Sequence, residues 1–249
     1  MNAGSPLMAQ LALLDDTARP EDDWRVRTSE RARRLAVRVL PGGLVEIVVP
    51  RGTRPRVIEQ FVTRHRTWID RKLAQYRPLD RAAAERLPER IQFAANGESF
   101  DVQYADAPGV LRLTVDGRTI RMSGQRARSI VMRHALQRFA MRQAHLIFSP
   151  WLAGLSLATG LSFERLQIRR QRTRWGSCSR NGTISLNVCL LFQPPDVVNY
   201  LLVHELAHTR HMNHSARFWD LVGRIEPRWR VLDAELTHGW RAVPAWVLR

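Results

Sequence analysis

Cysteines and long apolar segments are both scarce in this sequence. Its two cysteines, Cys178 and Cys189, form no CxxC pair, and two cysteines in 249 residues do not make a disulfide framework. We therefore expect a reducing, cytoplasmic location. No apolar run approaches the roughly 18 residues of a membrane span, so we expect no membrane partner. The apolar stretch 7–14 has no basic flank before it and is followed by two aspartates. It is a poor signal peptide, and we expect residues 1–23 to form a disordered tail.

Lysine is almost absent as well. Lys72 is the only lysine among 39 basic residues, and with 23 acidic residues the net charge is +16. Such a surplus attracts nucleic acids, anionic lipids or acidic protein segments. Because the basic residues are spread through the chain, we expect a basic surface rather than a disordered basic arm, with DNA or RNA as a candidate partner.

The hydrophobic pattern predicts an α+β protein with a β-rich N-terminal region that includes a helix, over residues 24–125. Two β-rich runs, 35–40 and 44–49, flank a Pro-Gly-Gly turn and predict a hairpin. Apolar residues recur at helical spacing over residues 56–76. Three further strands are expected at 100–104, 110–115 and 119–122, the last two joined by an Asp-Gly turn.

Residues 126–249 are expected to form a second, mainly helical domain. A long helical pattern covers residues 127–155, with Pro150 as a candidate break. A strand at 165–169 is followed by a hairpin of 174–178 and 183–187 around an Asn-Gly turn. Pro194 and Pro195 then open a helix that extends at least to His208, and short helices are expected at 216–225 and 230–237.

The chemistry is concentrated in the segment His204-Glu205-Leu206-Ala207-His208, which fits the pattern HExxH. Residues four apart lie on the same face of an α-helix, so two imidazoles can converge on one zinc ion. Glu205 is offset by one residue and can hold a water molecule beside the ion. The preceding residues have the apolar pattern of a buried helix, which supports the zinc interpretation over chance.

A catalytic zinc ion takes three protein ligands, and four residues compete for the third position. His211 lies almost a full turn beyond His208 along the helix axis, which places it poorly for the same ion. If the helix ends near Asn213, the chain can turn His214 back over the metal, and we favour His214. The acidic alternatives are Glu226 and Glu235.

These parts predict a hydrolase. Zinc lowers the pKa of a bound water and polarises a scissile carbonyl, while Glu205 takes the proton of the water and passes it to the leaving amine. The oxyanion needs a stabilising group, for which the sequence offers Tyr200, His211, Arg174 and His238 without choosing among them.

Several segments together resemble the YgjP-like metallopeptidase family, relatives of the WLM and SprT-like zincins. The segments are Thr173-Arg-Trp-Gly-Ser-Cys178, Ile184-Ser-Leu-Asn187, Tyr200 with Val203-His-Glu-Leu-Ala-His208, Asn213-His-Ser215 and Phe218-Trp219, with a weaker match from residue 24 onward. The resemblance implies His204, His208 and His214 as ligands and Glu205 as the catalytic residue. It also implies a zincin-like helical core packed on a short antiparallel sheet. His211 stands where metzincins have glycine, and no methionine follows Met212, which argues against a metzincin.

Three interpretations remain open from the sequence. The first is a zinc-dependent peptidase acting on peptides or proteins. The second is a nucleic-acid-associated zincin that cuts DNA- or RNA-bound protein. The third is a non-catalytic, basic nucleic-acid-binding module in which the metal only holds the helices together. Glu205 speaks against it, since a structural zinc site needs no carboxylate beside its ligands. The segment 174–178 is either an edge strand lining a substrate cleft or a packed hairpin with a buried tryptophan.

Overall fold

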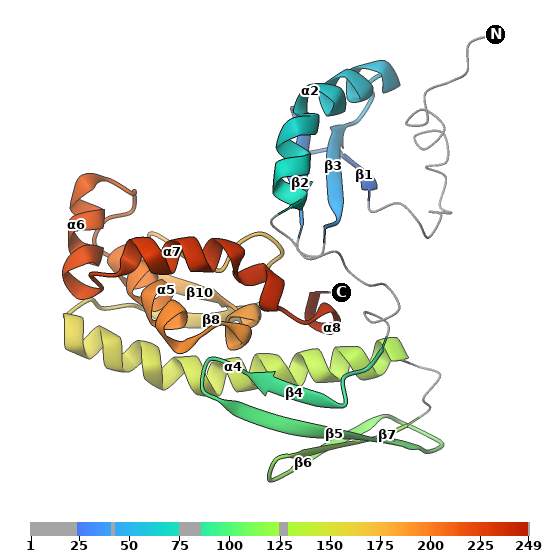
Figure 1. Ribbon diagram of the computed structural model, residues 1–249, viewed down its shortest axis with the longest axis vertical. Helices are drawn as coiled ribbons and strands as arrows, with labels where there is room; N and C mark the ends of the chain where they lie inside the picture. Colours follow the sequence, from blue (N-terminus) through green and yellow to red (C-terminus); the bar gives the residue numbers. More distant parts are fainter. Residues whose placement is uncertain (1–23, 41–42, 75–85, 125–128, 249) are drawn as a thin grey trace. The chain divides into compact units, whose positions relative to one another are not determined.

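The computed structural model describes residues 24–40, 43–74, 86–124 and 129–248, and its α+β architecture confirms the predicted class (Figure 1). The expected disordered tail, 1–23, lies outside the described residues. The chain divides into two compact units, Met1–Leu79 and Asp80–Arg249, which we call the N-terminal and C-terminal units. This division lies earlier in the chain than the boundary predicted after residue 125.

The N-terminal unit is a three-stranded sheet covered by one helix. Strands β1 (Trp24–Ser29), β3 (Val45–Pro50) and β2 (Ala36–Val39) lie in that order, with β1 parallel and β2 antiparallel to β3. The β2–β3 pair confirms the predicted hairpin. Helix α2 (Pro55–Leu73) covers the sheet and buries Ile58, Val62 and Ile69 against it. The core of the unit is formed by Val39, Val45, Ile47, Val49, Ile58, Val62 and Ile69.

A four-stranded sheet opens the C-terminal unit. Its strands are β4 (Arg90–Phe93), β5 (Glu98–Asp106), β7 (Thr119–Gly124) and β6 (Arg112–Asp116), in that order. The β6–β7 hairpin confirms the predicted Asp-Gly turn, in which Gly117 adopts a positive φ of 55°. Phe93 and Phe100 both contact Phe139 of the following helix. This packing explains why β4 to β7 belong with the helices rather than with the N-terminal sheet.

Helix α4 (Ser129–Thr159) runs through Pro150 without ending, so the candidate break does not occur. Pro150 cannot donate to the carbonyl of residue 146, but Leu146 is an exposed residue, and water can bond that carbonyl instead. The buried stripe of α4 recurs every four residues and consists of Leu136, Ala140, Ala144, Phe148 and Leu152. The helix lies between the four-stranded sheet and the layer that holds α5, β8 and β10 (Figure 1).

The second sheet of this unit is mixed, where the sequence led us to expect an antiparallel one. Strands β8 (Arg165–Arg169), β10 (Thr183–Asn187) and β9 (Gly176–Cys178) lie in that order. The β9–β10 pair is the predicted antiparallel hairpin, whereas β10 pairs with β8 in parallel. Strand β10 is central and buried along its whole length, and β9 forms an edge of the sheet.

The remaining helices surround α5 (Pro195–Ala207). This helix contacts α4, α6 (Ala216–Ile225), α7 (Trp229–His238) and strand β9. A short 3-10 turn, η1 (Val188–Phe192), leads into α5, and η2 (Gly239–Ala242) with α8 (Ala245–Leu248) closes the described chain. Within the described ranges, no helix combines the length and apolar character that crossing a membrane requires.

Candidate metal centre

Helix α5 holds two of the predicted site histidines on one face. It begins with Pro195 in its first turn, followed by Asp196, a carboxylate suited to the positive end of the helix dipole. His204 and His208 follow one helical turn apart, with ring centroids separated by 4.9 Å. The HExxH spacing therefore places both imidazoles together, as the sequence predicts.

The end of α5 brings the third histidine back to the first two. The helix ends at Ala207, earlier than the end near Asn213 that the sequence suggests, and the amide of His211 donates to the carbonyl of Ala207 at 2.9 Å in the turn that follows. The chain then turns back, and His214 Nε2 lies 3.1 Å from His204 Nε2. The chain therefore turns back toward α5 as predicted, but the helix ends earlier than expected.

One ligand nitrogen from each of His204, His208 and His214 lies within 4.8 Å of the others. Among the described residues, no other group of three His, Cys, Asp or Glu side chains meets that criterion. Two nitrogens bound to one tetrahedral zinc ion at about 2.0–2.1 Å are about 3.3 Å apart, close to the observed separation of the two Nε2 atoms. The donor set therefore fits a metal ion held by three imidazoles.

Hydrogen bonds fix which nitrogen of each α5 histidine faces this centre. His208 Nδ1 donates to the carbonyl of His211 at 3.0 Å. The Tyr200 hydroxyl donates to Asp233 Oδ1 at 2.8 Å and lies 3.3 Å from His204 Nδ1, whose N–H can donate to the hydroxyl oxygen. Both rings thus use Nδ1 for orientation and leave Nε2 for an ion, an arrangement common around protein-bound metals.

The surroundings also keep these imidazoles neutral. Burial lowers the pKa of His204 to about 3, and the neighbouring charges of His208 and His214 act in the same direction. Burial lowers the pKa of His208 as well, although its bond to the His211 carbonyl opposes the shift. A neutral imidazole has a free lone pair at neutral pH, which is the form that binds metal.

An aromatic wall from α6 confines the three rings. Phe218 is fully buried, with ring centroids 4.9 Å from His204, 4.5 Å from His208 and 4.8 Å from His214. Trp219 lies 5.5 Å from the His214 ring and stacks on Trp229 at 4.2 Å. This packing restricts the rotation of the imidazoles, so α6 preorganises the cluster.

Glu205 faces a different environment from its neighbour His204. Its side chain is 3% exposed, and its Oε2 atom is buried without a hydrogen-bond partner among the described residues. Burial raises the pKa of the carboxyl to about 8, against an opposing effect of Arg174. A Cβ atom at Gly176 of β9 would lie 2.5 Å from Glu205 Oε1, so the strand approaches the carboxylate more closely than any larger residue would permit.

The segment 174–178 forms a packed hairpin whose strand lies at an edge of the sheet, and Trp175 is half-buried rather than buried; that the strand lines a substrate cleft stays a prediction. Trp175 stacks on Trp240 with centroids 4.1 Å apart, and the hairpin is packed. Its strand β9 is nevertheless an edge strand beside Glu205. Burial and the charge of Glu205 raise the pKa of Cys178 to about 11, so this thiol is not a poised nucleophile.

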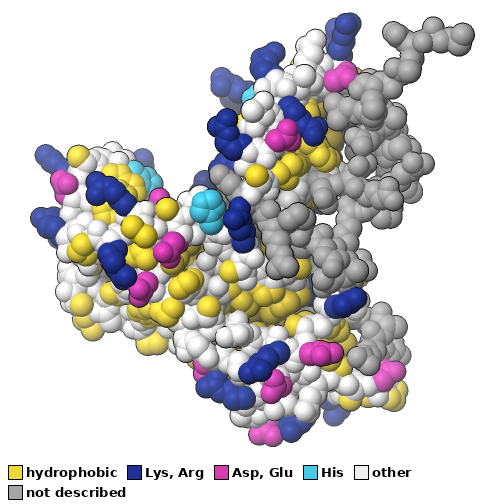
Figure 2. All heavy atoms as spheres, viewed as in Figure 1, with side chains coloured by type: hydrophobic (Ala, Val, Ile, Leu, Met, Phe, Trp, Pro, Cys, Tyr) yellow, Lys and Arg dark blue, Asp and Glu magenta, His cyan; other side chains and the backbone are white. Residues whose placement is uncertain are grey.

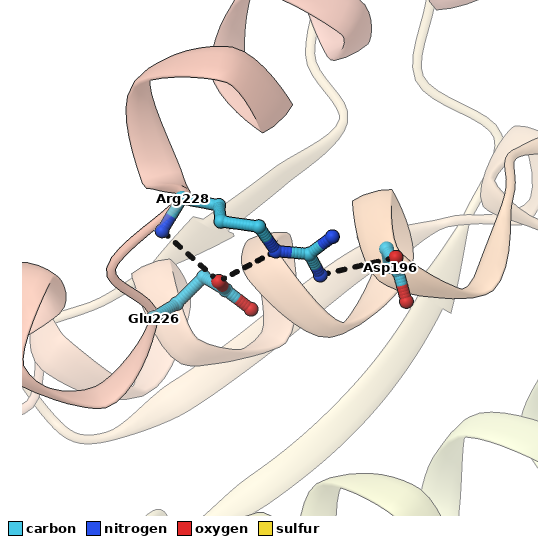
Figure 3. A network of polar contacts seen from close by, with 3 residues as sticks. All are labelled: Asp196, Glu226 and Arg228. Carbon is cyan, nitrogen blue, oxygen red and sulfur yellow. Dashed lines mark hydrogen bonds and ion pairs between the residues drawn. The ribbon is translucent and has the colours of Figure 1, made fainter.

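The other candidates from the sequence lie outside the histidine cluster. Glu226 pairs with Arg228, which also bonds Asp196 at 3.0 Å, and Figure 3 shows the guanidinium between the two carboxylates. Glu235 and His238 are exposed on α7. The His211 side chain is not part of the cluster; its carbonyl orients His208 instead.

Tyr200, a candidate oxyanion stabiliser, is buried, and its hydroxyl is engaged by Asp233 and His204. Sequence reasoning missed Asp233, because 33 residues separate it from Tyr200 and only the fold joins them. It also missed Asn187, whose Nδ2 donates to the carbonyls of Gln171 and Arg174 at 2.8 and 2.7 Å and fixes the segment that precedes β9. Asn187 is fully buried, and a polar amide at the end of the apolar run Ile184-Ser-Leu-Asn187 is the signal that could have found it.

Comparison with known proteins gives a family match and a similar solved structure. A family model described as YgjP-like, metallopeptidase domain, matches residues 33–239. Among solved structures, the chain is similar to the metallopeptidase zymogen of Pyrococcus abyssi abylysin, with 26% sequence identity and a TM-score of 0.33, over 35% of this chain and 90% of that chain. No curated protein matches the chain.

Proposed function

This chain belongs to the YgjP-like metallopeptidase family, and on that premise we propose that it is a zinc-dependent peptidase with a glutamate general base. We assign His204, His208 and His214 as ligands and Glu205 as the catalytic residue. The observation that carries the proposal is the three-imidazole cluster beside a buried carboxylate whose Oε2 has no partner among the described residues.

The family implies a metal ion and a protein or peptide substrate. Three imidazole ligands suit zinc, and a site with three protein ligands keeps one position open for chemistry. When bound there, zinc would supply a Lewis acid that polarises a carbonyl and lowers the pKa of water. The remaining steps depend on the side chains of the chain itself.

Glu205 is the proton carrier in this proposal. It follows His204 directly, so its carboxylate can accept a proton from the attacking water and return it to the leaving amine. A pKa near neutrality serves both transfers, and burial supplies that shift. The Oε2 atom has no hydrogen-bond partner among the described residues, so it is free to accept that proton.

Two features of the segment 174–178 fit substrate binding. Strand β9 is an edge strand, so an extended peptide can pair with its free side and lie beside Glu205. Arg174 is exposed and carries a charge that acts on Glu205, which favours it over Tyr200 as the group that stabilises the oxyanion.

Metal content of the purified protein tests the ligand assignment. We expect about one zinc ion per chain in the wild type, loss of the ion in His214→Ala, and retention in His211→Ala, since only the carbonyl of His211 is used. Glu205→Gln should keep the metal and the fold but abolish cleavage of a peptide that the wild type cuts. Full activity of this variant would refute the general-base assignment.

A further inference from the structure

The described part of the N-terminal unit carries a strong positive charge. It contains thirteen Lys and Arg residues against only four acidic residues, Glu30, Glu46, Glu59 and Asp70. Figure 2 shows dark-blue basic side chains on the part of the surface that contains α2. A unit with one small core has no structural need for this excess, because each unpaired guanidinium repels the others.

Three of the four acidic residues already pair with arginines. Glu46 is buried and lies 3.5 Å from Arg27 and 3.8 Å from Arg38. Asp70 pairs with Arg66 along α2. Glu30 pairs with Arg51 at 3.3 Å. Within the described part of this unit, few acidic groups remain to neutralise the other arginines.

The strand pairing brings many of the excess arginines together at one end of the unit. Because β1 and β3 are parallel, Ser29 lies opposite Pro50, and the loops that follow them leave the same edge of the sheet. The Glu30–Arg51 pair joins these two loops. The first turn of α2 lacks an acidic residue. Six exposed arginines emerge here, which we call the strand-end arginine cluster: Arg31, Arg33, Arg34, Arg51, Arg54 and Arg56.

We propose that the strand-end arginine cluster binds the phosphate backbone of a nucleic acid. Within the described parts of the chain, five of the six guanidiniums form no ion pair, and Glu30 is the only carboxylate paired with the cluster. Arginine presents a planar fork of donors that bonds phosphate oxygens in pairs. A row of phosphates would relieve the mutual repulsion and release counterions, which drives binding independent of base sequence.

A nucleic acid fits this surface better than an anionic membrane does. Peripheral membrane surfaces combine basic residues with several large apolar side chains that enter the bilayer. Near the cluster, Val57 is exposed, while Leu35 packs against the core of the unit and Trp68 lies toward the other end of α2. The cluster is thus polar and charged, as a phosphate-binding surface is.

Fluorescence anisotropy of the full-length protein with labelled DNA and RNA duplexes of about 20 base pairs tests the proposal, at about 50 and 200 mM salt. We expect steeply salt-dependent binding to at least one duplex. The variant Arg31→Gln/Arg33→Gln/Arg34→Gln should weaken binding by at least about tenfold and lower the salt slope by up to about three. The lysine counterpart of this triple variant keeps the charge and should retain most of the affinity.

The matched control removes the same charge elsewhere, from the exposed Arg112, Arg142 and Arg180 of the C-terminal unit. It should bind close to the wild type, as should Glu205→Gln, because the surface acts independently of the metal centre. Absence of binding at low salt, an unchanged affinity of the glutamine triple variant, or an equal loss in the control would overturn the proposal. Binding to phosphatidylserine vesicles but to neither duplex would also overturn it, in favour of a membrane surface.

Discussion

Replacing Gly176 by alanine should impair turnover without removing the metal. The added Cβ would lie 2.5 Å from Glu205 Oε1 and 2.9 Å from its Cγ and Cδ, about 1 Å closer than ordinary contact. Neither side can yield easily, because Gly176 pairs with Leu186 in the sheet and the carboxylate is buried. To remove this steric overlap, either Glu205 or β9 must move by about 1 Å.

A misplacement of about 1 Å at a reacting group can reduce the rate on the order of a hundredfold, and overpacking costs roughly 1–3 kcal/mol of stability. We therefore expect Gly176→Ala to lower kcat on a quenched fluorescent peptide about a hundredfold and to lower Tm, while zinc content stays near the wild-type value. Gly154→Ala on α4 is the control, because nothing lies within 4 Å of its added Cβ. It should stabilise the helix by about 0.5–1 kcal/mol. Wild-type kcat and Tm in Gly176→Ala would refute the reasoning.

Three further predictions concern the groups around the cluster. Because the pKa of Glu205 is raised to about 8, the metal-free fold should lose stability as the pH rises from about 4.5 through 8, by at most about 5 kcal/mol. Urea unfolding of chelator-treated protein at pH 5 and 8.5 should show that Glu205→Gln removes this loss; equal losses in both proteins would contradict it. Asp233→Asn and Tyr200→Phe should weaken zinc binding about tenfold to a hundredfold in a chelator competition, since the network orients His204; unchanged affinities would show that it does not. Glu226→Gln should keep the metal, as measured by elemental analysis, because Glu226 pairs with an arginine away from the cluster; loss of the ion would return Glu226 to the candidate ligands.

Local signals were sufficient to predict most elements but not their pairing. The Asn181-Gly182 turn could be predicted from the sequence, because glycine adopts a positive φ easily and Gly182 has a φ of 72°. The hairpin of β9 and β10 follows from this turn. The direction of β10 relative to β8 could not be predicted from the sequence, since side chains alternate between the two faces in both parallel and antiparallel strands. Likewise, Pro150 signals a break in α4, but the long buried stripe holds the helix together across it.

In the candidate site too, some features could be predicted from local sequence and others could not. Helical spacing alone brings His204 and His208 together, and a chain reversal was enough to anticipate the approach of His214. Their roles as ligands stay predictions that the metal analysis will test. Asp233 and Gly176 could not be found from the sequence, because each meets the site through tertiary packing rather than through a local pattern.

Adjacent residues of α5 face opposite partners, so the two functions that we propose for His204 and Glu205 would be separated along one helix. His204 faces Tyr200 and the aromatic wall of α6, while Glu205 faces β9 and the charge of Arg174. Substitutions on the α6 and α7 side should therefore change metal affinity first, whereas substitutions in β9 should change turnover with the metal retained. A helix with neighbours on both sides can hold an ion and position a proton carrier independently, because different elements restrain the two side chains.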